Sequence, residues 1–185
     1  MEIILLRHGK PKVVLRGNLN TKDLKQLVFD YEQSGIQEPP SEKLKTQFTN
    51  HYAVCSDLVR SAESAKKLSL APVSDALFRE TDIPHFDNIP LKLPVTAWII
   101  LLRVMWLFGF SKNGESFAQA KNRSRQAAEK LISLAEENEK IIVVGHGLMN
   151  HLIGKQLLKK GWLESERAGK RFWEFRRYTV NHLEV

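Results

Sequence analysis

Short apolar runs in this chain alternate with longer stretches in which apolar residues recur every three or four positions. Residues 3–6, 52–55 and 141–144 are compact runs rich in Ile, Val and Leu, which is typical of buried strands. The longer periodic stretches predict helices at residues 21–35, 42–49, 61–70, 93–110, 115–138 and 148–157. Strands that alternate with helices predict a mostly parallel central sheet covered on both faces, a three-layer α/β/α sandwich.

Two regions of the pattern lack a helical period. Residues 78–94 are punctuated by three prolines and are expected to be irregular, as are residues 10–20. Near the carboxyl end, residues 171–180 are rich in aromatic and β-branched side chains, which predicts a strand at a sheet edge. Thr21 is the expected N-cap of the first helix, and Gly35 the expected end of that helix.

Length and composition limit the possibilities. We expect residues 1–185 to form one domain, since a domain commonly holds roughly 100–200 residues. Lysine and arginine total 28 against 21 acidic residues, so the net charge of +7 favours anionic partners. Cys55 is the single cysteine, which excludes an intrachain disulfide and fits a reducing compartment. The start of the chain lacks the basic leader of a secretory signal, and we expect a cytoplasmic protein.

The helix predicted at residues 93–110 is apolar nearly all round but carries Arg103 at its middle. A membrane span needs about 20 mostly apolar residues, and a central arginine opposes insertion. We therefore interpret the segment as a buried or capping helix, with an interface or homodimer contact as the next alternative and no transmembrane span. Arg103 could extend to solvent, pair with a carboxylate or face a substrate.

The residues that directly follow the three predicted strands carry the candidate chemistry. Arg7-His8-Gly9 follows the first strand, Ser56 and then Arg60 follow the second, and Gly145-His146-Gly147 ends the third. Ligands of open α/β sheets bind where the carboxyl ends of the strands meet. We therefore expect Arg7, His8, Arg60 and His146 to converge on one site.

These residue types suit phosphoryl transfer. The guanidinium groups of Arg7 and Arg60 can each bind two phosphate oxygens, and His146 can supply a further donor. His8 is then the candidate nucleophile, because a neutral ring nitrogen can attack phosphorus and form a phosphohistidine. Both arginines disfavour a positive charge on His8. The arginines take over the charge neutralisation that a metal would provide, so we expect neither a metal nor a cofactor.

A leaving alkoxide needs a proton, and Glu80 is the preferred donor, with Asp82 in reserve. Loss of that proton should make activity fall on the alkaline side. Four other histidines, His51, His85, His151 and His182, are interpreted as ordinary surface or partly buried residues, although His85 lies near the acidic segment.

Across most of its length the chain resembles the histidine phosphatase superfamily, also called the phosphoglycerate mutase-like family. The resemblance rests on Arg7-His8-Gly9, on residues 56–65, on Glu80 and on Gly145-His146-Gly147, in that order along the chain. It implies a phosphoglycerate mutase-like α/β sandwich, phosphorylation of His8, a phosphate pocket of Arg7, Arg60 and His146, and proton donation by Glu80. Gly114-Glu115-Ser116 and Arg123 are also similar to a family segment, and we expect them to support the site indirectly.

Departures from the family pattern bear on the substrate. Lys10-Pro11 replaces the acidic or amide residue and the Ser or Thr that often follow the first motif, and residues 81–86 replace a Trp-Glu-Gly stretch. These differences favour a phosphatase over a mutase, with a phosphorylated small molecule or a phosphoprotein as substrate.

Three alternatives remain open. The first is a catalytically weak phosphate-binding module, and the second is phosphoglycerate mutase-type transfer. The third, nucleic-acid binding, rests on the net charge and on a basic cluster around Phe172 and Trp173. Its basic residues are Lys170, Arg171, Arg176 and Arg177. Basic residues are scattered over many predicted elements, so we expect no nucleic-acid partner.

Overall fold

The computed structural model describes residues 1–87, 89–112, 114–167, 169 and 171–180. Its strands are β1 (Glu2–Arg7), β2 (Asn18–Leu19), β3 (Tyr52–Cys55), β4 (Val73–Ser74), β5 (Leu93–Pro94), β6 (Lys140–Gly145), β7 (Leu163–Arg167) and β8 (Phe175–Thr179). Its helices are α1 (Thr21–Glu32), α2 (Glu42–Gln47), α3 (Val59–Lys67), the 3-10 helix η1 (Ala76–Phe78), α4 (Val95–Leu107), α5 (Phe117–Asn138) and α6 (Gly147–Lys159).

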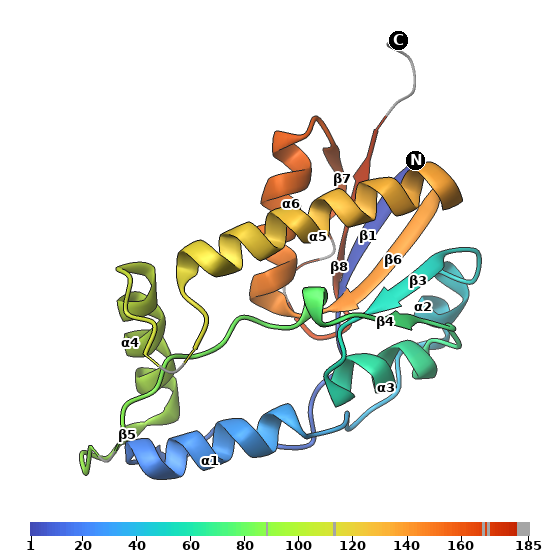
Figure 1. The fold of residues 1–185 in the computed structure, drawn as a ribbon. Helices are drawn as coiled ribbons and strands as arrows, with labels where there is room; N and C mark the ends of the chain where they lie inside the picture. Colours follow the sequence, from blue (N-terminus) through green and yellow to red (C-terminus); the bar gives the residue numbers. More distant parts are fainter. Residues whose placement is uncertain (88, 113, 168, 170, 181–185) are drawn as a thin grey trace.

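A mostly parallel sheet organises the described part of the chain (Figure 1). Six strands lie in the order β4-β3-β6-β1-β8-β7, and β4, β3, β6 and β1 run parallel to one another. Strand β8 is antiparallel to β1, and β7 is antiparallel to β8. The predicted α/β fold with a mostly parallel central sheet is confirmed.

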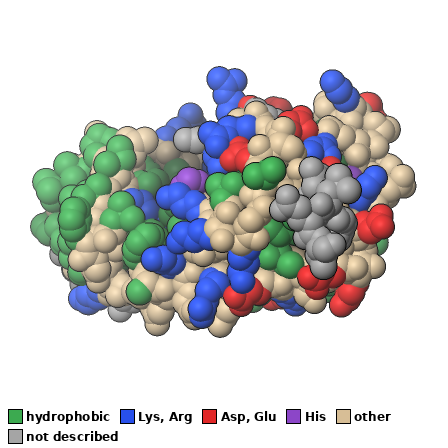
Figure 2. All heavy atoms as spheres, turned by 90° about the horizontal axis from the view of Figure 1, so that it is seen from above, with side chains coloured by type: hydrophobic (Ala, Val, Ile, Leu, Met, Phe, Trp, Pro, Cys, Tyr) green, Lys and Arg blue, Asp and Glu red, His purple; other side chains and the backbone are tan. Residues whose placement is uncertain are grey.

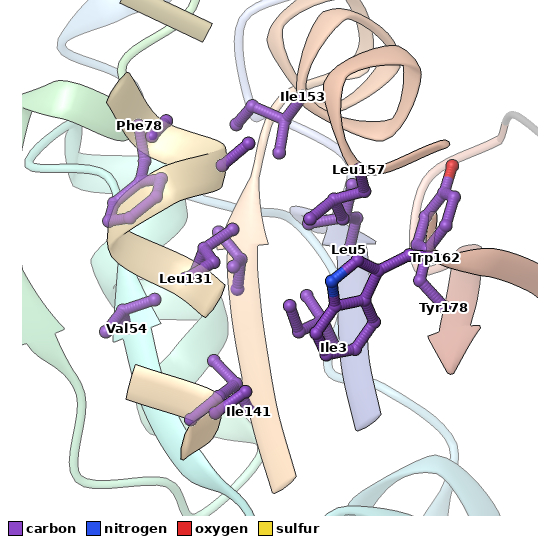
Figure 3. Close-up of a cluster of buried hydrophobic side chains, with 14 of the residues drawn as sticks. Ile3, Leu5, Val54, Phe78, Leu131, Ile141, Ile153, Leu157, Trp162 and Tyr178 are labelled. Carbon is purple, nitrogen blue, oxygen red and sulfur yellow. The ribbon is translucent and has the colours of Figure 1, made fainter. Parts of the chain in front are cut away.

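Alternate residues of the central strands enter two different cores. On one face, Ile3 and Leu5 of β1 pack against α5 and α6, where Leu131, Ile153 and Leu157 are also buried (Figure 3). On the other face, Ile4 and Leu6 pack against α3 and the end of α2. Each such buried side chain contributes roughly 1.5–3 kcal/mol relative to exposure, which makes the central strands the rigid part of the fold.

Helices α1 and α4 lie beyond the carboxyl ends of β1, β3 and β6 (Figure 1). They share a separate core in which Leu24 of α1 meets Trp98 and Leu102 of α4. The indole N–H of Trp98 donates to the Leu19 carbonyl oxygen at 2.7 Å. Strands β2 and β5 form a small antiparallel pair beside this core, within segments that the sequence predicts as irregular.

The prediction of an edge strand at residues 171–180 is wrong in position. Strand β8 covers Phe175–Thr179 and lies between β1 and β7, so β7 occupies the edge. The sequence of β7, Leu-Glu-Ser-Glu-Arg, has no β-branched or aromatic residue and carries no strand signal. Pairing with β8 and the ion pair between Glu166 and Arg177 hold it in place.

The predicted ends of the first helix are also wrong. Asn20 is the N-cap of α1, and its side chain accepts a hydrogen bond from the Asp23 backbone N–H at 2.9 Å. The Thr21 hydroxyl instead accepts from the backbone N–H of Ile89 at 2.8 Å, so it joins α1 to the irregular segment. The helix ends at Glu32, before Gly35.

Candidate active site

The ends of three parallel strands lie at the same level of the sheet. Arg7 of β1 is paired with Gly145 of β6, and Cys55 of β3 is paired with Val144. The pairing continues one step further, because the His8 N–H donates to the Gly145 carbonyl at 3.0 Å. His8 and His146 therefore leave neighbouring strands at the same edge. Their ring centroids lie 5.0 Å apart.

Hydrogen bonds define the protonation of the His8 ring. Its Nδ1 lies 2.7 Å from the Gly9 carbonyl oxygen, which can only accept, so Nδ1 carries the proton. The Nε–H of Arg60 points at Nε2 of His8 from 3.3 Å, which requires a lone pair on that nitrogen. The ring is thus held as the Nδ1–H tautomer, and the Nε2 lone pair accepts a hydrogen bond from the guanidinium group of Arg60.

Arg60 is fixed by the end of α1. Its Nη1 donates to the backbone carbonyls of Tyr31 and Glu32 at 3.4 and 3.3 Å, and its Cζ lies 4.8 Å from the Tyr31 ring centroid. The residue is 2% exposed. The end of one helix and the start of another, α3, therefore hold this cation beside His8.

Both imidazoles are neutral at physiological pH. Burial, followed by the nearby Arg60 charge, lowers the pKa of His8 to about 3. Burial also depresses the pKa of His146 well below its usual value, with His8 and Arg60 acting in the same direction. Neither ring nitrogen of His146 has a hydrogen-bond partner among the described residues. Buried polar atoms normally have partners, so this ring marks a position suited to a polar ligand.

Arg7 completes the cationic side of the site. Its guanidinium carbon lies 4.4 Å from the ring centroid of Phe172, and the first residue of α6, Gly147, lies beside it. The Phe172 ring is also 5.5 Å from the His8 ring, measured between centroids. The structure therefore brings Arg7, His8, Arg60 and His146 into one cluster.

Aromatic side chains from the turn before β8 cover this cluster. Gly9 allows the closest approach, because a Cβ atom at this position would lie 2.4 Å from Cζ2 of Trp173. Phe172 packs against both Arg7 and His8, and His8 is only 2% exposed. The sequence offered no signal for this cover, since the position of Phe172 depends on the hairpin of β7 and β8.

Glu80 lies at the start of α6. Its carboxylate accepts hydrogen bonds from the backbone N–H groups of Leu148 and Met149, at 3.2 and 3.0 Å, and from Thr81 at 3.0 Å. Because α6 begins directly after His146, these bonds place the acid next to the histidine cluster. Glu80 and Arg7 also line one cavity of about 410 Å³.

Asp82, the reserve proton donor, has a different setting. Its carboxylate accepts from the Glu115 backbone N–H at 3.0 Å, and its carbonyl oxygen accepts from Arg103 at 2.8 Å. These contacts join the irregular segment to α4 and to the loop before α5. Glu80 is thus the acid whose carboxylate is hydrogen-bonded to the helix that follows His146.

Arg123 of α5 positions the segment that carries Glu80. Its Nη1 donates to the carbonyl oxygens of Leu77 and Arg79 at 3.1 and 2.7 Å. Glu115 accepts from the other side of the same guanidinium group at 2.8 and 2.6 Å. Arg123 thereby ties the backbone just before Glu80 to the long helix.

The basic cluster at the end of the chain is partly neutralised. Arg177 pairs with Glu2 and with Glu166. Lys170 lies outside the described residues. Among the residues that the structure describes, no group of three or more His, Cys, Asp or Glu side chains is arranged to hold a metal ion, and no helix is long and apolar enough to cross a membrane.

Comparison with known proteins identifies the family. The sequence model of the histidine phosphatase superfamily (branch 1) matches residues 3–171. The chain belongs to this superfamily. The resemblance predicted from Arg7-His8-Gly9 and the later motifs is therefore confirmed. No curated protein sequence matches the chain.

Solved structures share the fold of this histidine phosphatase superfamily member. Rv3214 from Mycobacterium tuberculosis has a TM-score of 0.65 and 16% identity, over 98% of this chain and 92% of its own. Mycobacterial glucosyl-3-phosphoglycerate phosphatase Rv2419c, in complex with VO3, has a TM-score of 0.55 and 20% identity, over 85% and 80%. TTHB049 from Thermus thermophilus has a TM-score of 0.51 and 21% identity, over 80% of each chain. At these identities the likeness establishes the fold.

Proposed function

We propose that this chain is a metal-independent phosphatase that hydrolyses phosphomonoesters through a phosphohistidine on His8. The observation that carries the proposal is the geometry of the His8 ring, whose Nδ1 lies 2.7 Å from the Gly9 carbonyl oxygen and whose Nε2 lies 3.3 Å from the Nε of the buried Arg60. Attack on a phosphate ester requires a nucleophilic atom without a proton, here Nε2, next to fixed cations.

In the first half-reaction, Nε2 of His8 forms a bond to phosphorus while the bond between phosphorus and the ester oxygen breaks. Arg7 and Arg60 neutralise the phosphate oxygens, and His146 supplies a further hydrogen bond. Glu80, in its protonated form, transfers its proton to the leaving alkoxide. The products are a free alcohol and phosphohistidine.

In the second half-reaction, water attacks phosphorus and the bond from phosphorus to nitrogen breaks. Glu80, now a carboxylate, accepts the proton from water, which restores its protonated form and releases inorganic phosphate. Arg7 and Arg60 again neutralise the negative charge on the phosphoryl oxygens. Arg7 and Arg60 carry out the charge neutralisation in both halves, which is why the mechanism needs no metal.

The cationic site and the family support the proposed class of substrate. The structural relative in complex with VO3 is named a glucosyl-3-phosphoglycerate phosphatase. For this chain we propose a phosphorylated small molecule or a phosphoprotein as the substrate. The cytoplasm stays our expectation for its location.

The experiment compares the wild-type protein with His8→Ala during turnover of an aryl phosphate in chelator. Rapid quenching should trap an acid-labile, base-stable phosphoprotein in the wild type and none in His8→Ala. His51→Gln is a matched control, since His51 lies just before β3, at the opposite end of the sheet from the site, and contacts Glu2. It should retain the phosphoprotein.

Other results would identify the alternatives. Phosphate binding without phosphoprotein or turnover would identify a phosphate-binding module. Transfer of the phosphoryl group to an added alcohol in preference to water would identify a mutase-type reaction. Turnover that persists in His8→Ala would refute the proposed nucleophile.

A further inference from the structure

Helix α4 has a buried side and an exposed side, and both are apolar. Trp98, Leu102 and Trp106 are 1–2% exposed and face the α1 segment and α5. The opposite side, which we name the α4 outer face, is formed by large exposed side chains. These are Ile100, Leu101, Val104, Leu107 and Phe108. Phe108 is 88% exposed and Ile100 is 65% exposed, and Figure 2 shows a gathering of apolar side chains at this end of the molecule.

The one charged residue of α4 does not interrupt the outer face. The guanidinium group of Arg103 donates to the carbonyl oxygens of Thr81 and Asp82 at 2.9 and 2.8 Å. Its Cζ also lies 5.2 Å from the Trp106 ring centroid, on the buried side. These contacts with backbone carbonyls are not among the three alternatives that the sequence left open for Arg103.

The surroundings of the outer face are basic. Residues 91–112 contain Lys92, Arg103 and Lys112 and no acidic residue. Lys92 precedes the helix and Lys112 follows it; both are exposed, and Lys112 contacts Asp87 at 3.3 Å. An apolar face bordered by lysines complements a surface that is apolar inside and negatively charged outside.

A second copy of the chain fits this face less well. A standard interface uses about 20–30 residues on each side, far more than the exposed side chains of one 13-residue helix. A two-fold contact through α4 would also bring lysines of the two copies toward one another. A span is excluded for α4 by its length, because about 20 residues are needed to cross a bilayer.

We propose that the α4 outer face docks on an anionic lipid surface. The apolar side chains enter the boundary between headgroups and acyl chains, and Lys92 and Lys112 contact the headgroups. Helix α4 lies on the side of the sheet to which the carboxyl ends of β1, β3 and β6 point (Figure 1). Docking therefore brings the candidate active site close to the lipid surface.

The test is flotation of the full chain with phosphatidylcholine vesicles, with and without phosphatidylserine. The wild type should bind the vesicles that contain phosphatidylserine. The double variant Ile100→Ser/Phe108→Ser should bind about tenfold more weakly or worse, because two large apolar side chains no longer enter the membrane. Leu163→Ser in β7 is the matched control, since Leu163 is also exposed, at 64%, and should bind like the wild type.

Lysine variants test the electrostatic contribution to vesicle binding. Replacement of Lys92 by Ala should weaken binding about fivefold, and replacement of Lys112, which pairs with Asp87, should weaken it less. Added salt should also weaken wild-type binding. A thermal unfolding measurement on each variant checks that it is folded. His8→Ala should bind vesicles like the wild type, so docking and catalysis are tested separately.

Three results would overturn the proposal. The first is a wild type that stays unbound with both kinds of vesicle. The second is equal vesicle binding by the wild type and Ile100→Ser/Phe108→Ser. The third is a concentration-dependent dimer in sedimentation equilibrium that the same double variant abolishes, which would assign the α4 outer face to a second copy.

Discussion

The ring of Phe172 lies against the guanidinium group of Arg7, with 4.4 Å between its centroid and the arginine Cζ. The same ring is 5.5 Å from the His8 ring, so one side chain contacts both a proposed phosphate-binding residue and the proposed nucleophile. Because His8 is 2% exposed, a substrate has to displace this cover before it reaches Nε2.

Phe172→Ala should therefore lower KM. A cation–π contact of this kind contributes about 1 kcal/mol to the covered state, and its loss should lower KM for an aryl phosphate about fivefold. Steady-state kinetics measure the change, with Phe29→Ala on the exposed side of α1 as the control. A higher KM in Phe172→Ala would mean that the ring holds Arg7 in place for the substrate.

Arg60→Lys should be severely impaired although its charge is kept. An ammonium group cannot reproduce the Nε–H directed at His8 together with the bonds to the Tyr31 and Glu32 carbonyls. We expect kcat/KM to fall roughly 10²-fold, the usual cost of losing a donor to a developing charge. Arg79→Lys is the control, because Arg79 pairs with Asp57 at the surface. Equal activity of Arg60→Lys and Arg79→Lys would show that a positive charge alone suffices at position 60.

The convergence of Arg7, His8 and His146 could be predicted because it follows from local pattern. Compact Ile, Val and Leu runs specify buried parallel strands, and the residue after each run lies at the common carboxyl edge. Arg60 is the second residue of the helix that follows its strand. None of these placements requires knowledge of a distant loop.

The parts that could not be predicted depend on contacts between distant segments. Strand β7 is polar and is stabilised by pairing with β8, so its own residues carry no signal. Phe172 contacts His8 because β8 begins beside the carboxyl end of β1, where Phe175 is paired with Leu6. The bonds of Arg123 are made to backbone carbonyls, which leave no trace in the side-chain pattern.

Arg123→Met should slow the reaction because it displaces Glu80, the proposed proton donor. Without the bonds to the Leu77 and Arg79 carbonyls, the segment before Glu80 loses its tie to α5, and the acid shifts from its position. We expect kcat to fall about tenfold for alkyl phosphates, which need a proton on the leaving oxygen, and much less for activated aryl phosphates. Glu80→Gln should show the same dependence on the leaving group. A uniform loss across all esters would indicate a general disturbance of the fold.

The depressed pKa of His8 predicts how stability depends on pH. In the unfolded chain the ring takes up a proton below about pH 6.5, whereas in the folded chain its pKa is about 3. Between these values the unfolded state binds more protons, so the free energy of unfolding falls as the pH drops and is not affected by this group above about 6.5.

The slope from His8 is about 1.4 kcal/mol per pH unit, and His146 acts in the same direction because its pKa is also depressed. Carboxylates also make the free energy of unfolding depend on pH. The informative measurement therefore compares the wild type with a variant that lacks the His8 ring. Urea unfolding between pH 4 and 6.5, for the wild type and His8→Asn, should give a shallower dependence in the variant by about that slope. Identical slopes would mean that the folded protein protonates His8 as readily as the unfolded chain does, and the ring would then not be the neutral nucleophile proposed.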